Sequence, residues 1–88
     1  MGGRIDTDPD ALIAMARELD NATKTIDASM RRVKSQLNAS SWNDPVRKQF
    51  EQNLEAVSRL VKQIDTISGE SSSLLHRKAQ QLREYLGR

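Results

Sequence analysis

Few side chains in this 88-residue chain belong to the types that catalyse reactions or bind metals. His76 is the only histidine and cysteine is absent, so the ligands of a zinc site cannot be assembled. The serine run at residues 71–73 lies in neither a nucleophile elbow nor a Ser-x-x-Lys pattern. The sequence also lacks a glycine-rich phosphate loop. We therefore expect a protein without enzymatic activity, metal or cofactor.

The most distinctive segment surrounds Trp42, the only tryptophan, near the middle of the chain. Asp44 and Pro45 follow it and form a helix start, because the aspartate can accept from the free amides of a first turn and proline suits its first position. Asp8 and Pro9 repeat this pattern. The sequence predicts a flexible N-terminus over residues 1–7, a helix over 9–39, a turn over 40–44 and a helix over 45–86.

Both predicted helices carry apolar side chains at the steps of three and four residues that mark a buried helical stripe. In the first helix an unbroken seam consists of Leu12, Ala16, Leu19, Thr23, Ile26, Met30, Val33 and Leu37. In the second helix one stripe consists of Val46, Phe50, Leu54, Val57, Val61 and Ile64. The residues that widen this stripe toward a second face are Leu60, Ile67, Leu74 and Leu75. A wide stripe indicates that the second helix has two neighbours.

Residues 68–73, Ser-Gly-Glu-Ser-Ser-Ser, form a weak point in the second helix. Glycine costs about 1 kcal/mol relative to alanine in a helix, and serine is a mediocre helix former. We interpret the segment as a soft or kinked turn inside one helix. The alternative is a break, with a third helix that starts at residues 71–73.

These patterns predict an all-α fold, an antiparallel helical hairpin that completes a four-helix bundle by dimerisation. Two helices side by side leave the outer half of each apolar stripe uncovered. A globular chain of this size buries only about 60–65% of the surface that its unfolded chain exposes, and a two-helix rod buries less. A second copy or a different hairpin of matching pattern would complete the core. The residues expected in the hairpin and dimer core are Leu19, Ile26, Met30, Val33, Leu54, Val57, Val61 and Ile64.

The bend carries the candidate recognition motif, which consists of Trp42, Asn43, Asp44 and Phe50. Phe50 lies two helical turns beyond Trp42 and is expected to point the same way. We interpret Trp42 either as an apolar plug at the bend or as a surface that another protein reads. The two roles are compatible with one another.

The charge distribution favours protein partners over nucleic acid. The net charge is only +2, although the isoelectric point is near 9.3. Basic residues gather toward both ends of the predicted hairpin, and only three aromatic residues are present for base stacking. The longest apolar run, residues 11–16, is too short to span a membrane, and it follows acidic rather than basic residues, unlike a signal peptide.

Two segments resemble the WXG family. These are the opening residues 4–12, Arg-Ile-Asp-Thr-Asp-Pro-Asp-Ala-Leu, and Trp42-Asn43-Asp44 with Phe50 behind it, between helices of roughly equal length. The family consists of small helical-hairpin proteins, similar to the early secreted antigenic target, that type VII secretion systems export. The resemblance covers nearly the whole chain, with Trp-x-Asp in place of the family's Trp-x-Gly.

The resemblance implies a non-enzymatic secreted protein, or a secretion partner, that acts by dimerisation and helix-bundle binding. The implied partners are a second copy, a related helical-hairpin protein or the N-terminal domain of a toxin, together with a secretion ATPase. Such a protein is made in the cytoplasm and exported without a cleaved signal peptide. The alternative is a generic helical adaptor or a chaperone-like partner of a larger protein, and nucleic-acid binding is the weaker rival.

Overall fold

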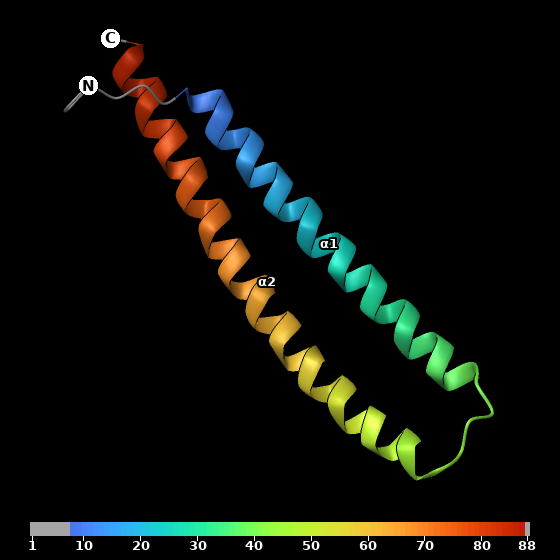
Figure 1. The fold of residues 1–88 in the computed structure, drawn as a ribbon. Helices are drawn as coiled ribbons and strands as arrows, with labels where there is room; N and C mark the ends of the chain where they lie inside the picture. Colours follow the sequence, from blue (N-terminus) through green and yellow to red (C-terminus); the bar gives the residue numbers. More distant parts are fainter. Residues whose placement is uncertain (1–7, 88) are drawn as a thin grey trace.

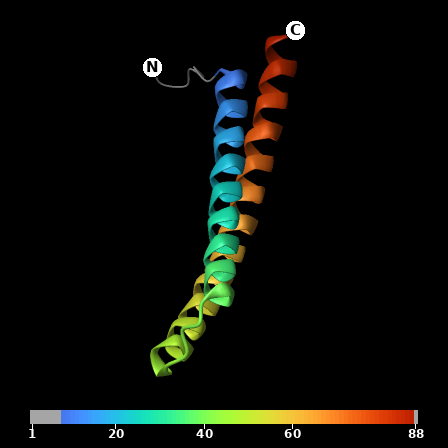
Figure 2. The ribbon, with the colours of Figure 1, turned by 90° about the vertical axis from the view of Figure 1, so that its right-hand side faces the viewer.

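A computed structural model describes residues 8–87 of the chain. It contains two long helices, α1 (Pro9–Ala39) and α2 (Pro45–Leu86), which run antiparallel as a hairpin (Figure 1). The hairpin is a thin rod with extents of 66 × 22 × 18 Å, and Figure 2 shows that it is bent, with the turn swung to one side. The predicted all-α hairpin is therefore confirmed. The flexible N-terminus expected over residues 1–7 lies outside the described residues.

Both helices begin at an Asp-Pro pair. The Asp8 carboxylate accepts from the backbone N–H of Asp10 at 3.0 Å, with Pro9 in the first turn. Asp44 performs the same function for α2, where Pro45 is the first residue. These local signals start a helix because the aspartate satisfies amides that have no intrahelical partner and proline has no amide to satisfy.

Helix α2 passes through residues 68–73 without a break. Gly69 is helical, and a Cβ atom at this position would meet no other atom within 4 Å. Ser72 is buried against α1. A serine run is accommodated here because a small side chain permits close approach between two helices, which offsets its modest helix propensity.

The hairpin core is concentrated at the end opposite the turn. Leu12 from α1 packs with Ala79 and Leu82 from α2, and partly buried Ile13 and Leu75 pack against this cluster. The same end holds an exposed ion pair in which the Arg83 guanidinium donates to the Asp10 carboxylate at 2.7 Å. Exposed pairs of this kind contribute little stability. The packed apolar side chains, rather than the ion pair, therefore hold the two helices together at this end.

The remainder of the hairpin is thinly packed. Among the described residues no large side chain is fully buried, and the fully buried positions are the small Ala16 and Ala79. In the half of the described hairpin that is nearer the turn, Val61 is the only buried hydrophobic residue. A two-helix rod has no third element to cover the outer sides of its helices, so much apolar surface stays exposed.

Candidate binding surface

The side of α2 that faces α1 is rich in small and polar side chains. We call it the inner seam; its members recur every three or four residues, and they are Leu54, Ser58, Val61, Asp65, Ser68, Ser72, Leu75, Ala79 and Leu82. All of them are buried or half-buried. In the middle of this seam, positions that would usually hold leucine or isoleucine hold serine and aspartate. The inner seam alone therefore provides a weak apolar interface.

The large aliphatic side chains of α2 lie instead on a second, exposed seam. The outer seam consists of Val57, Leu60, Ile64, Ile67 and Leu74, with exposed fractions of 43, 57, 41, 62 and 58%. These residues follow the steps of three and four that characterise a coiled-coil contact stripe, with Ser71 in the remaining position. The outer seam is an apolar stripe, interrupted at Ser71, that α1 covers only in part.

The apolar surface continues from α2 onto α1. A groove of about 620 Å³ is lined by Leu75 of the inner seam and by α1 residues Ala14, Met15, Glu18, Leu19 and Ala22. Leu75 directly follows Leu74 of the outer seam, and Met15 is half exposed. We call the outer seam together with Met15, Leu19, Ala22 and Leu75 the apolar face.

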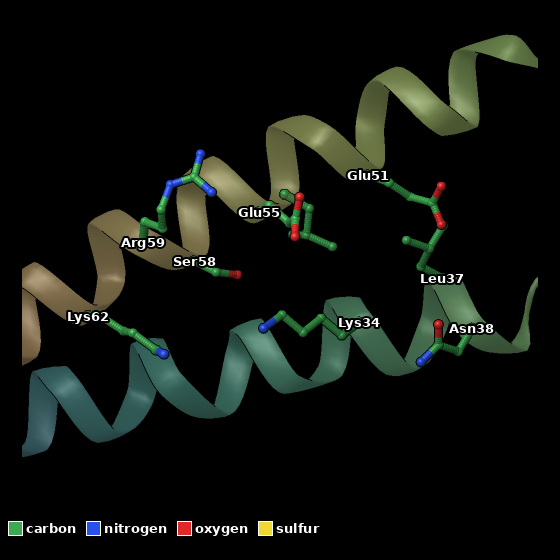
Figure 3. Close-up of a pocket in the computed structure, with 9 residues that line it drawn as sticks. Lys34, Leu37, Asn38, Glu51, Glu55, Ser58, Arg59 and Lys62 are labelled. Carbon is green, nitrogen blue, oxygen red and sulfur yellow. The ribbon is translucent and has the colours of Figure 1, made fainter.

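The opposite side of the hairpin carries charges of both signs. Lys34 of α1 and Glu51, Glu55, Arg59 and Lys62 of α2 surround a groove of about 430 Å³ near the turn (Figure 3). The Lys34 and Lys62 side chains extend into the space between the helices, and Glu51 and Glu55 lie on the same side. Alternating charges keep this side hydrated, so the hairpin presents two chemically different faces.

Two carboxylates meet between the helices at mid-length. Asp65 of the inner seam and Asp27 of α1 line a groove of about 200 Å³ together with Arg31, Lys34 and Lys62. Asp65 is half-buried, and its buried Oδ1 atom has no hydrogen-bond partner. Burial raises the pKa of Asp65 above its ordinary value of 3.8, and the negative charge of the neighbouring Asp27 raises it further. We therefore expect the stability of the hairpin to depend on the protonation of Asp65.

We expect Asp65→Asn to be more stable than the wild type at neutral pH, because it removes a half-buried charge beside Asp27. The raised pKa means that folded Asp65 holds a proton at pH values where unfolded Asp65 has lost it. The stability of the wild type should therefore rise relative to Asp65→Asn as the pH falls toward 3.8, and this contribution is lost as the pH rises through the folded pKa. Urea unfolding at a series of pH values measures the difference.

The matched control for this measurement is Asp20→Asn, which changes the same chemical group at an exposed position on α1. Its stability should follow the wild type across the pH series. An Asp65→Asn curve parallel to the wild type at all pH values would contradict a coupled carboxyl pair.

The turn is held by a compact hydrogen-bond network around Asp44. One carboxylate oxygen, Oδ1, accepts from the Trp42 indole N–H at 2.7 Å and from the backbone N–H groups of Val46 and Arg47 at 3.0 and 3.1 Å. The Arg47 guanidinium donates to the Trp42 carbonyl oxygen at 2.6 Å. A single aspartate therefore caps α2 and fixes the indole, which orients the turn relative to the helix.

Trp42 is half-buried at the end of the rod and packs on Phe50. Their ring centroids are 6.0 Å apart and the ring planes are tilted by 39°, a spacing typical of aromatic pairs. Asn43 follows Trp42 in the turn and is exposed. The four residues of the candidate recognition motif thus lie together, with the indole only partly covered.

The residues expected to share one core are divided by the structure. Leu19, Ile26, Met30, Val33 and Leu54 are half-buried in the hairpin, whereas Val61 is buried. Val57 and Ile64, which were assigned to the same stripe as Val61, are exposed on the outer seam. Sequence reasoning missed the polar members of the inner seam, although Leu54, Val61, Leu75 and Leu82 mark it at multiples of seven residues.

The described residues contain no group of three or more histidine, cysteine, aspartate or glutamate side chains that could hold a metal ion. Neither α1 nor α2 is apolar enough along its length to cross a membrane. Comparisons with protein families, with curated proteins and with solved structures found no match to the chain.

Proposed function

We propose that the protein is a non-enzymatic binding component of a type VII-like secretion system that packs its apolar face against another helical hairpin. The observation that carries this proposal is the outer seam, whose five aliphatic side chains are each at least two-fifths exposed. Monomeric soluble proteins rarely expose extended apolar stripes of this kind. The surface is suited to a partner with a matching apolar helix.

Energetic considerations support binding through this face. Full burial of a valine, leucine or isoleucine side chain contributes about 1.5–3 kcal/mol. Because the inner seam contains serine and aspartate, its burial against α1 stabilises the hairpin only weakly. Covering the outer seam with a partner helix adds a second apolar interface. Helical hairpins with such stripes complete their cores as four-helix bundles.

The assignment to secretion rests on the resemblance of the turn and the opening segment to the WXG family. The structure supplies a physical reason for a recognition role of the turn. Trp42 is fixed by Asp44 and Arg47 and stays partly exposed at the tip of the rod, so a rigid aromatic surface is available to a secretion ATPase. Rigid, partly exposed tryptophan side chains are frequent anchors in protein interfaces.

Nucleic-acid binding receives no support from the charged side of the hairpin. Lys34, Arg59 and Lys62 share their groove with Glu51 and Glu55. A phosphate backbone would require a surface of predominantly positive potential.

We expect purified protein to be helical and at least dimeric at micromolar concentration, with a melting temperature that rises with protein concentration. Light scattering and thermal unfolding by circular dichroism measure the two properties. Export is tested in a host that carries a type VII-like system, with a strain that lacks the secretion ATPase as control.

A cooperative monomer that binds no other helical hairpin would overturn the proposal. A dimer that stays inside the cell in both strains would instead indicate the adaptor or chaperone-like function.

A further inference from the structure

We propose that Asp27 of α1 and Asp65 of α2 act as a proton-dependent latch between the two helices. A proton on Asp65 keeps the middle of the hairpin closed, between Val61 and Leu75. Loss of this proton lets α1 and α2 separate there while both ends of the hairpin stay in place. The inference concerns the hairpin alone and does not depend on the proposed function.

The first argument is the composition of the inner seam in this stretch. Between Val61 and Leu75 the seam consists of Asp65, Ser68 and Ser72 and has no aliphatic member. Side chains of these types bury little apolar surface, so the hydrophobic effect contributes little to holding this part of α2 against α1. The ionisation of a single carboxyl group can therefore decide whether the contact persists.

The second argument is that the two ends of the hairpin are held independently of this stretch. At one end Leu12 of α1 packs with Ala79 and Leu82 of α2. At the other end the turn joins the two helices covalently (Figure 1). An opening that is confined to the middle leaves both attachments in place, as in the partial openings that precede complete unfolding in many proteins.

The third argument is the balance of charge around the two carboxyl groups. The groove that contains Asp27 and Asp65 is also lined by Arg31 and Lys34 of α1 and by Lys62 of α2. Within residues 8–87, however, neither carboxylate forms an ion pair with any of these bases. Like charges repel more strongly in a partly buried groove than in water. The closed hairpin therefore holds two neighbouring negative charges that no direct ion pair neutralises.

The fourth argument is the state of the polar atoms in this groove. Asp65 Oδ1 and Ser58 Oγ are both buried, and neither has a hydrogen-bond partner. An ionised oxygen without a partner is costly in such a place, and protonation of the carboxyl group lowers this cost. In the same direction, burial and the Asp27 charge raise the pKa of Asp65 in the closed hairpin.

Separation of the helices returns Asp65 to water and its pKa toward the ordinary value of 3.8. The closed hairpin therefore binds the proton more tightly than the open one. It follows that the closed form is favoured most at low pH, and that this advantage is lost as the pH rises through the pKa of closed Asp65.

Thiol labelling at Ser72 measures the opening, because this side chain is buried and the chain has no cysteine of its own. Ser72→Cys is treated with a dipyridyl disulfide at a series of pH values, and each rate is divided by that of the urea-unfolded protein at the same pH. We expect this ratio to fall by about fivefold as the pH falls from neutral toward 3.8, at the lower end of the range for coupled sites in proteins. Ser68→Cys provides a second labelling position in the same stretch.

Substitutions of the carboxyl groups identify the source of this dependence. Asp65→Asn, added to Ser72→Cys, should slow labelling at neutral pH by about the same fivefold and abolish the pH dependence. Asp27→Asn should reduce the dependence, because it removes the neighbouring charge and leaves the burial of Asp65 unchanged. Asp20→Asn is the matched control at an exposed position of α1 and should have no effect. Circular dichroism checks the folding of each variant.

The urea dependence of labelling distinguishes a local opening from complete unfolding. A local opening exposes little surface, so labelling should be nearly independent of urea at concentrations well below the unfolding transition. Labelling that accelerates as steeply as complete unfolding would overturn the latch. Labelling without pH dependence, or with a dependence that persists in Asp65→Asn, would overturn it as well. All of these outcomes leave the proposed function intact, because association and export are measured separately.

Discussion

Ile64→Glu should leave the protein monomeric at concentrations where the wild type associates. Ile64 lies at the centre of the outer seam, and a glutamate there would place an unpaired charge in the apolar contact. Loss of the buried isoleucine costs about 1.5–3 kcal/mol, and a two-fold interface contains it twice, so the association constant should fall by about 10² to 10⁴. Light scattering across a concentration series measures the change.

The hairpin itself should survive this substitution, because Ile64 lies on the outer seam and is already 41% exposed. Thr66→Glu is the matched control, since it introduces the same charge two residues away on the solvent side of α2. It should associate like the wild type. Equal association of Ile64→Glu and Thr66→Glu would show that the outer seam is not the binding surface.

Trp42→Ala should abolish export while the dimer persists. Complete burial of a tryptophan would make the substitution cost about 3–5 kcal/mol. Because Trp42 is only half-buried beside Phe50, we expect a loss of about 2 kcal/mol, roughly half of that range. The variant is compared with the wild type by thermal unfolding, by solution mass and by the amount of protein exported.

Trp42→Phe separates the role of the ring from that of the indole N–H. It retains an aromatic side chain next to Phe50 but removes the donor to Asp44, so it should fold almost as well as the wild type. Reduced export by a stable Trp42→Phe dimer would indicate recognition of the indole itself. Normal export by a folded Trp42→Ala protein would show that the turn is not read and that Trp42 serves only packing.

The starts of both helices and the packing stripe of α1 could be predicted from local sequence signals. Asp8-Pro9 and Asp44-Pro45 are local signals, because each aspartate caps amides of its own helix and needs no distant partner. The buried stripe of α1 could also be predicted, since α1 has one narrow apolar stripe and one neighbour in the hairpin. Thr23, the one polar residue in this stripe, is also explained by a local interaction, because its hydroxyl donates to carbonyl groups of the preceding turn.

Only part of the hydrogen-bond network around Trp42 and Asp44 could be predicted from the sequence. The sequence indicated Asp44 as a cap, and the structure shows that the same oxygen also accepts from the Trp42 indole. That contact depends on the path of the chain between the helices, which composition and periodicity do not specify.

The side of α2 that faces α1 could not be predicted from the sequence, because it depends on long-range packing. Two stripes of α2 follow steps of three and four, and hydrophobicity alone favours burial of the one that contains Ile64 and Ile67. The packing of Leu12 against Ala79 and Leu82 fixes the rotation of α2 at the end opposite the turn. Because successive residues of a helix are turned by about 100°, the side that faces α1 at one end also decides which residues face α1 farther along α2. Ser58 and Asp65 are therefore turned inward, and the large aliphatic side chains are left on the surface.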